Sequence, residues 1–359
     1  MDEHVKHKFW ARIRKHRVII LSILGVILVA GLTTGAFIIY NQSNNVAQAP
    51  EAVVENTPAP EPIKYYSPLT GLLVADEVAT KQPVTGIMIE NSTSARPQSG
   101  LKNSGVIFEA IAEGGITRFL VLYQQEKPQL IGPVRSIRLY DVEWVAAFNA
   151  SVAHIGGSAG GLAEIRNGSY RDIDQFFNPG AYWRVSDRYA PHNVYTSFER
   201  LDALNTAKGY TSSIFTGFSR IDEKPAEVLD ATQITIDISG PLFDNVYTYD
   251  VATNSYLRSQ AGAPHLDRED GQINPKVVVA MRVDETTVFE DGNRELIITI
   301  SSGAGTIFQN GTAIPVTWSK ASKTDQIKFT DAQGNDVPLV RGQTWLVAVP
   351  SDDGNVTWQ

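Results

Sequence analysis

Cysteine is absent from this 359-residue sequence. Its absence excludes disulfides, thiolate metal sites, a cysteine nucleophile and lipid attachment through an N-terminal cysteine. Stability must therefore come from the burial of apolar side chains, and a globular region of about 295 residues is long enough to supply it.

Histidine is scarce as well. Outside the N-terminal segment it occurs only at His154, His192 and His265, and no H-x-x-x-H pattern is present. A zinc site would need assembly from distant positions, so we predict no metal. The glycine-rich stretch beginning at His154 matches neither common nucleotide-binding pattern, so we predict no cofactor.

Positive charge is in deficit over most of the chain. The sequence has 31 Lys and Arg against 39 Asp and Glu, and residues 1–40 hold six of the basic and two of the acidic side chains. Residues 41–359 therefore hold 25 basic and 37 acidic ones. An acidic region is a poor partner for nucleic acid, so we expect no nucleic-acid binding.

One stretch lacks charge altogether. Residues 18–40, VIILSILGVILVAGLTTGAFIIY, contain 23 uncharged residues, and about 20 apolar residues in a helix cross a bilayer. The six basic residues that precede this run all lie in 1–17, which predicts a cytoplasmic N-terminus and an extracytoplasmic remainder. A signal peptide cleaved after Ala49 is the alternative, but Pro50 follows that site and the apolar run exceeds the usual length of about 7–15 residues. We therefore predict a single-pass anchor in the cell membrane.

The rest of the chain is predicted to be α+β. Residues 41–64 contain four prolines, three glutamates and no aromatic residue, which is typical of an extended linker. Residues 65–225 are predicted to form a mixed α/β domain. Its strands are expected at 84–90, 105–112, 117–124 and 151–155, and its helices at 138–150, at a short segment ending at 166, and at 198–208.

Residues 226–359 follow the period of β-strands. Strands are expected at 276–283, 295–301, 312–318, 326–330 and 344–349. Asp-Gly and Asn-Gly pairs, among them Asp291-Gly292, mark turns between such strands. This half is predicted to be a mostly antiparallel β domain, either a separate sandwich or a sheet packed on the first half.

Charged residues flank apolar runs in the stretch EGGITRFLVLYQQEKPQLIGPVRSIR. Buried charge is costly unless it is paired. Glu109 and Glu113 therefore either pair with nearby arginines or line a site with them. Arg118, Arg135 and Arg138 have the fork geometry that suits carboxylate or phosphate. We predict ligand-binding roles for Glu109 and the three arginines, and a catalytic role for Glu113 if the protein is an enzyme.

The segment HIGGSAGG contains the pattern G-x-S-x-G between a predicted strand and a predicted helix. This context is the one that a nucleophile elbow requires. Ser158 would be the nucleophile and His192 the base, with Asp174 or Asp187 as the third member. A glycine-rich loop that holds an anion or packs closely explains the same letters. The β-rich second half also lacks the βα units of such hydrolases.

The loop RYAPHNVY gathers polar and aromatic side chains around a proline. Such a loop suits ligand contact by His192 and Asn193, and a packed structural loop explains it equally well. His154 is a further ligand-binding candidate, although a lone histidine is more often a satisfied hydrogen-bonding residue.

Several motifs together resemble the YerB-like family of bacterial envelope proteins, a domain of unknown function. The motifs, spread over residues 65–349, are SPLTG, ARPQSGL, EGGITR, IGPVRS, HIGGS, APHNVY, GAPHLD and TWSK. The resemblance implies an N-terminal and a C-terminal domain outside the membrane, and no established reaction. Familiar members look like lipoproteins anchored through cysteine, which this chain lacks.

Two functional hypotheses follow. The favoured one is a membrane-anchored envelope protein, held by residues 18–40, that binds a cell-wall or surface ligand such as peptidoglycan through its α+β domain. The alternative is a cell-envelope hydrolase that uses Ser158 or a glutamate with a histidine. The serine hydrolase requires a histidine within hydrogen-bonding reach of Ser158 Oγ.

Overall fold

The computed structural model describes residues 3–44, 63–288 and 294–359. The chain divides into two compact units, Met1–Pro62 and Ile63–Gln359. Most of the predicted linker, the Ala47–Ala49 cleavage pattern and the Asp291-Gly292 turn lie outside the described residues.

The first unit contains one long helix. Helix α1 spans Glu3–Asn44, and its stretch Leu21–Ser43 has 23 residues with a mean hydropathy of 2.3. This stretch is long and apolar enough to cross a membrane. It begins and ends three residues later than the predicted segment 18–40.

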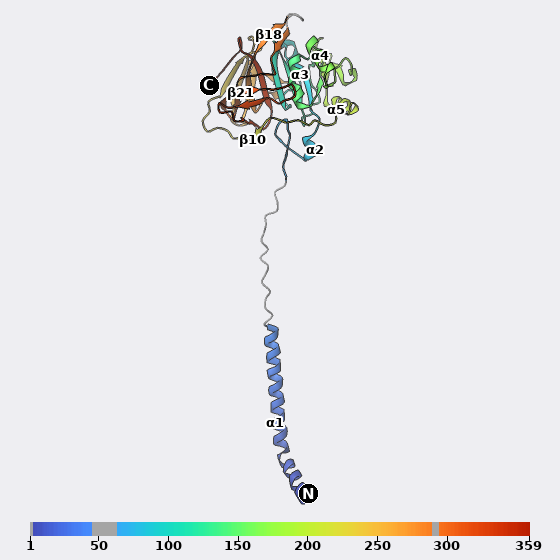
Figure 1. Ribbon diagram of the computed structural model, residues 1–359, viewed down its shortest axis with the longest axis vertical. Helices are drawn as coiled ribbons and strands as arrows, with labels where there is room; N and C mark the ends of the chain where they lie inside the picture. Colours follow the sequence, from blue (N-terminus) through green and yellow to red (C-terminus); the bar gives the residue numbers. More distant parts are fainter. Residues whose placement is uncertain (1–2, 45–62, 289–293) are drawn as a thin grey trace. The chain divides into compact units, whose positions relative to one another are not determined.

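A twelve-stranded mixed sheet organises the second unit (Figure 1). Its path runs through β22 (Lys328–Thr330), β21 (Thr312–Ser319), β20 (Ser302–Gln309), β17 (Val277–Val283), β24 (Thr344–Pro350), β4 (Val106–Glu113), β5 (Ile116–Tyr123), β3 (Thr85–Glu90), β6 (Ser151–Ala153) and β7 (Arg171–Asp172). The pair β18 (Glu285–Val288) and β19 (Arg294–Ile297) joins it beside β4.

Strands from both halves of the sequence meet within this sheet. Strand β24 pairs in parallel with β4, with Trp345 opposite Ile107. In Figure 1 the brown strands of the second half stand beside the teal strands of the first. The sequence left open a separate sandwich or a packed sheet. In the structure seven second-half strands, β17 to β22 and β24, belong to the same sheet as the first-half strands.

A five-stranded antiparallel sheet forms a second layer. It contains β14 (Ala263–Pro264), β13 (Ser255–Gln260), β12 (Asn245–Asp250), β11 (Gln233–Asp237) and β25 (Asn355–Trp358). Its inward tyrosines and isoleucines share one apolar core with the face of the large sheet that carries Phe119 and Trp345. The opposite face of the large sheet forms the other core, against α3.

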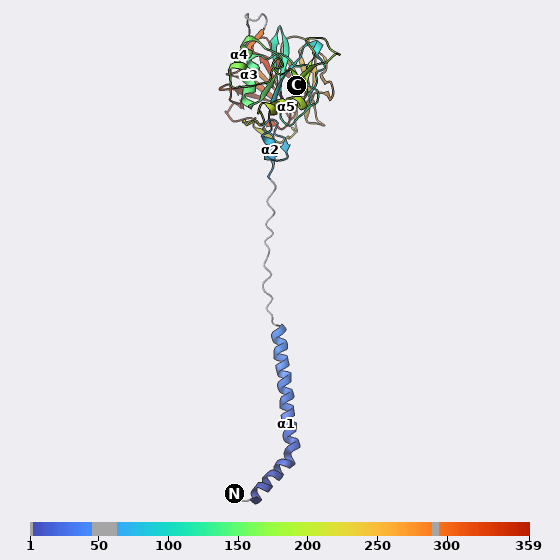
Figure 2. The same cartoon turned by 90° about the vertical axis from the view of Figure 1, so that its right-hand side faces the viewer.

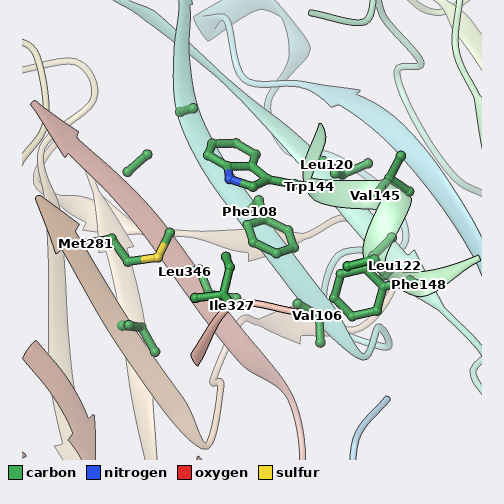
Figure 3. Packing of buried hydrophobic residues seen from close by; sticks show 14 of the residues in the cluster. Val106, Phe108, Leu120, Leu122, Trp144, Val145, Phe148, Met281, Ile327 and Leu346 are labelled. Carbon is green, nitrogen blue, oxygen red and sulfur yellow. The ribbon is translucent and has the colours of Figure 1, made fainter. Parts of the chain in front are cut away.

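Three short helices cover the first-half strands. They are α3 (Leu139–Val145), which continues into the 3-10 turn η2 (Ala146–Phe148), α4 (Ala159–Asn167) and α5 (Phe198–Ala207). Trp144 of α3 stacks on Phe108 of β4 with ring centroids 5.1 Å apart (Figure 3). Helices α3 and α4 are neighbours, as the turned view in Figure 2 also shows.

The remaining short elements are β1 (Tyr65–Tyr66), β2 (Leu73–Val74), α2 (Glu77–Thr80), η1 (Thr93–Ala95), η3 (Pro179–Ala181), β8 (Tyr182–Arg184), β9 (Val194–Thr196), β10 (Arg220–Ile221), β15 (Leu266–Asp267), β16 (Gly271–Gln272) and β23 (Leu339–Val340).

The predicted α+β fold class is confirmed. Strands β4 and β5 are buried on both faces, which explains why they were recognisable as continuous apolar runs. The helix expected at 138–150 is shorter, because its last turn tightens into η2 and ends at Asn149 in the left-handed conformation. The strand expected at 295–301 ends at Ile297, and the sequence analysis missed β20.

Candidate functional site

Charged side chains gather at the carboxyl ends of four strands of the large sheet. We call this end of the sheet the charged edge. Strands β4, β3, β6 and β7 run in the same direction, because β5 is antiparallel to both β4 and β3. Their carboxyl ends carry Glu113, Glu90, His154 and Asp172 respectively. Ligands of open sheets commonly bind outside the carboxyl ends of strands.

The segment 133–138 lies between two of these strand ends. Arg135 donates its backbone N–H to Met88 of β3, and its carbonyl accepts from Ile155. Ile137 donates to Gly156, and Ser158 donates back to Ile137. The predicted motifs IGPVRS and HIGGS are therefore neighbours in space.

Glu113 lies between two arginines. Arg118 Nη2 donates to Glu113 Oε1 at 3.0 Å, and Arg138 Nη2 donates to Glu113 Oε2. The two arginine side chains are 3% exposed and that of Glu113 is 33% exposed. Burial raises the pKa of Glu113, but Arg118, Arg138 and Arg135 outweigh it and the pKa is lowered. Glu113 is thus held as a carboxylate, a poor general acid at neutral pH.

Arg138 is the N-cap residue of α3. Its guanidinium donates to the carbonyls of Ala112 and Ile137, and its backbone N–H donates to Asp141 Oδ2 at 2.8 Å. Burial raises the pKa of the Asp141 carboxyl to about 7, although this backbone hydrogen bond opposes the shift. Arg138 therefore ties α3 to the end of β4, which is a structural duty as well as a charge at the site.

Arg135 faces a carboxylate that the sequence analysis did not single out. Arg135 Nε lies 3.4 Å from Glu90 Oε2, and His192 Nδ1 lies 2.9 Å from Glu90 Oε1. Ser92 Oγ also donates to Glu90 Oε1, at 2.8 Å. The sequence did not reveal Glu90, because a lone glutamate at the end of a strand forms no recognisable pattern. Its position opposite Arg118 follows only from the register of β3 and β5.

Three buried polar atoms at this edge have no hydrogen-bond partner within the described residues. They are Glu90 Oε2, Arg118 Nε and Arg135 Nε. Buried polar groups are normally satisfied, and leaving one unpaired costs about 1–3 kcal/mol. The arrangement therefore has unused hydrogen-bonding capacity beside side chains that solvent reaches.

His154 and Asn193 are both engaged inside the protein. His154 is buried, with Nδ1 2.8 Å from the carbonyl of Gly156 and Nε2 3.1 Å from Asp172 Oδ1. Asn193 accepts from Arg184 and donates to two carbonyls of its own loop. Both residues hold loops beside the site, and neither presents a free polar group.

Ser158 is the N-cap of α4. Its Oγ accepts from the backbone N–H of Gly161 at 3.2 Å. Within the described residues no histidine hydrogen-bonds to it: His192 contacts Glu90, and Asp174 contacts Arg166. The strand–loop–helix context that the motif predicts is present, but the predicted triad is not assembled.

Glu109 lies in a separate, sealed network. Its carboxylate and Arg258 are both fully buried and 2.9 Å apart, and Trp345 Nε1 donates to it at 2.9 Å. Arg258 also donates to His265 Nδ1, and His265 Nε2 reaches Gln98 at 2.9 Å. Burial, then the charge of Arg258, holds the pKa of His265 well below its ordinary value. We leave Glu109 out of the proposed site, because no ligand reaches a fully buried carboxylate.

The fold and this edge define an α+β protein whose two halves share one sheet and whose charged groups gather at the carboxyl ends of its strands. Residues 69–211 match the family described as "Protein of unknown function (DUF3048) N-terminal domain", and residues 234–346 match the corresponding C-terminal domain. The chain belongs to this YerB-like family, which confirms the resemblance seen in the motifs.

A relative and a solved structure agree with this assignment. The chain is 32% identical over 298 residues to a Bacillus subtilis (strain 168) protein named "Putative lipoprotein YerB", covering 81% of this chain and 88% of that protein. The crystal structure of YerB protein from Bacillus subtilis aligns with a TM-score of 0.72 and 29% identity, over 82% of this chain and all of that one.

Proposed function

We propose that this is a membrane-anchored envelope protein that binds a peptide component of the cell wall at the edge formed by β4, β3 and β6. Helix α1 serves as a single-pass anchor, with a cytoplasmic N-terminus and the second unit outside. The name of the Bacillus subtilis relative, a lipoprotein, supports an envelope location. A chain without cysteine cannot be lipidated in that way, so the apolar helix takes over the anchoring.

One observation carries the binding proposal. Arg135, His192 and Glu113 have side chains 20%, 25% and 33% exposed. Each is oriented by a nearly buried side chain: Glu90 contacts Arg135 and His192, and Arg118 and Arg138 contact Glu113. Arg135 Nε and Glu90 Oε2 face each other at 3.4 Å as an ion pair, and neither atom makes a hydrogen bond within the described residues. Charged side chains that are oriented by ion pairs, stay partly exposed and have hydrogen bonds left to make suit recognition of a ligand.

The ligand class follows from the signs of the accessible charges. Arg135 can donate to a carboxylate, and Glu113 can accept from an ammonium group. Wall stem peptides carry both groups, whereas a neutral glycan carries neither. The choice of a stem peptide as the ligand therefore rests on charge complementarity.

The test measures binding of the full chain, in lipid nanodiscs, to the synthetic stem pentapeptide L-Ala-γ-D-Glu-L-Lys-D-Ala-D-Ala. Arg135→Ala should weaken binding roughly ten- to hundredfold, because a hydrogen bond to a charged group contributes about 1.5–3 kcal/mol. Lys208→Ala removes the same charge from the exposed end of α5 and should bind like the wild type. Equal binding by Arg135→Ala, or by a peptide whose charged groups are all capped, would refute the proposal.

The contacts of Ser158 and Ser92 argue against a serine hydrolase. Ser158 is committed to the N-cap of α4. Ser92 lies 3.3 Å from His192 Nδ1, the same nitrogen that faces Glu90. A serine–histidine–carboxylate triad needs the serine and the carboxylate on different ring nitrogens.

A further inference from the structure

A second candidate site lies away from the charged edge. A cavity of about 920 Å³ opens between η2, the end of α4 with the loop leading into β7, the segment around Phe215, and the loop between β21 and β22. Pockets for small ligands commonly measure about 300–1,000 Å³. Its walls come from both halves of the chain, so no local sequence pattern could predict it.

The polar lining of this cavity is mostly neutral. It offers hydroxyl and amide side chains at Asn149, Ser169, Thr216, Ser319, Thr324 and Gln326. Within the described residues, no hydrogen bond occupies the side chains of Asn149, Ser169, Thr216 or Ser319. These groups are therefore free to bind a ligand that both donates and accepts hydrogen bonds.

The charged groups around the cavity balance one another. Glu164 and Asp325 stand against Arg171 and Lys328. Glu164 is already engaged, since Lys323 Nζ donates to it at 2.7 Å. Arg171 is also engaged, by the carbonyls of Asn149 and Ser212. A cavity without net charge favours a neutral ligand.

Two aromatic rings add stacking surface. Tyr170 is fixed by its hydroxyl, which donates to Glu164 at 2.7 Å. Its ring packs on the backbone of Gly168, where a Cβ would lie 2.2 Å from Tyr170 Cε2. Phe215 is held against Phe148, with ring centroids 5.6 Å apart. Held aromatic rings beside hydroxyl and amide groups are the chemistry that sugars require, because a sugar has an apolar face and a hydroxyl rim.

The loop 320–326 forms one wall and is itself fixed. The buried ammonium of Lys320 donates to the carbonyls of Lys323 and Asp325 within this loop. The Lys323–Glu164 ion pair then ties the loop to α4 across the cavity. The wall is therefore built in place before any ligand arrives, which lowers the entropy cost of binding.

We propose that this cavity binds a neutral saccharide, such as an N-acetylhexosamine stretch of the wall glycan. The site is separate from the charged edge, so it stands whether or not the peptide proposal does.

The test titrates the full chain with chitotetraose by calorimetry. Lipid nanodiscs are used because detergents with sugar headgroups would compete. Ala321→Trp fills the cavity from an exposed position on its wall and should weaken binding roughly tenfold or more. Ala252→Trp, at an exposed hairpin position elsewhere, and Arg135→Ala should bind like the wild type.

A second variant covers the case in which Ala321→Trp perturbs folding. Thr216→Val keeps the shape of an exposed side chain and removes its hydroxyl, so it should weaken binding about three- to tenfold. The proposal is overturned if the wild type does not bind chitotetraose or if both cavity variants bind normally. It is also overturned if tetragalacturonate, an anionic saccharide, binds more tightly. Loss of chitotetraose binding in Arg135→Ala would show that the saccharide binds at the charged edge, and this result would also overturn the proposal.

Discussion

The buried pair Glu109–Arg258 makes the sharpest prediction about what holds the two halves together. Glu109→Gln keeps the size of the side chain but removes its charge and replaces one of its two acceptor oxygens by an NH2 group, although Arg258 and Trp345 both donate to this carboxylate. Arg258 is then left fully buried with no carboxylate, 2.9 Å from an amide. Breaking one partner of a buried pair costs about 3–5 kcal/mol, against a total stability of about 5–15 kcal/mol for a domain.

The assay is chemical unfolding of the full chain followed by tryptophan fluorescence. Trp345 is a suitable reporter, because its Nε1 donates to Glu109 itself. Glu77→Gln is the matched control, since it breaks the exposed Glu77–Lys81 pair and should leave the midpoint unchanged.

A double variant, Glu109→Gln with Arg258→Met, should recover part of the loss, because it also removes the orphaned charge. If Glu109→Gln costs under about 1 kcal/mol, the pair is not the desolvated ion pair argued above.

Three further predictions concern the first half. Asp141 has a folded pKa of about 7 against an ordinary 3.8, so the folded state binds its proton more tightly and loses stability as pH rises from about 4 through 7, by at most about 4 kcal/mol. From pH 5 to pH 8 the unfolding midpoint of the wild type should therefore fall relative to that of Asp141→Asn. A difference between the two midpoints that does not change with pH would contradict this. Ser158→Ala should cost about 0.5–2 kcal/mol as a lost N-cap and leave peptide binding intact; abolished binding would reopen a functional role for Ser158. Gly217→Ala would place a Cβ 1.8 Å from the Pro68 carbonyl and should cost about 3 kcal/mol or more in a thermal melt, whereas Gly180→Ala, with nothing within 4 Å, should be tolerated.

The sequence left open whether these glutamates and arginines pair inside the protein or line a site. Glu109 belongs to a sealed frame, and Arg135 stands at an accessible edge. Glu113 is intermediate in burial: it pairs with the buried Arg118 and is itself partly exposed. Glu109 and Glu113 carry the same charge on the same strand, so burial alone separates them.

The sequence by itself determined the features that depend on local chemistry. The absence of cysteine excluded lipidation, the uncharged run predicted α1, and continuous apolar runs predicted β3, β4 and β5. Periodicity and composition suffice for these because each depends on neighbours along the chain.

Tertiary structure alone decided which distant groups meet. Arg258 reaches Glu109 across 149 positions, β24 joins β4, and Glu90 collects His192 from 102 positions away. The saccharide-sized cavity likewise takes its walls from segments far apart in the chain. A local pattern carries no record of its long-range partners, because burial and pairing are settled only when the strands close into one sheet.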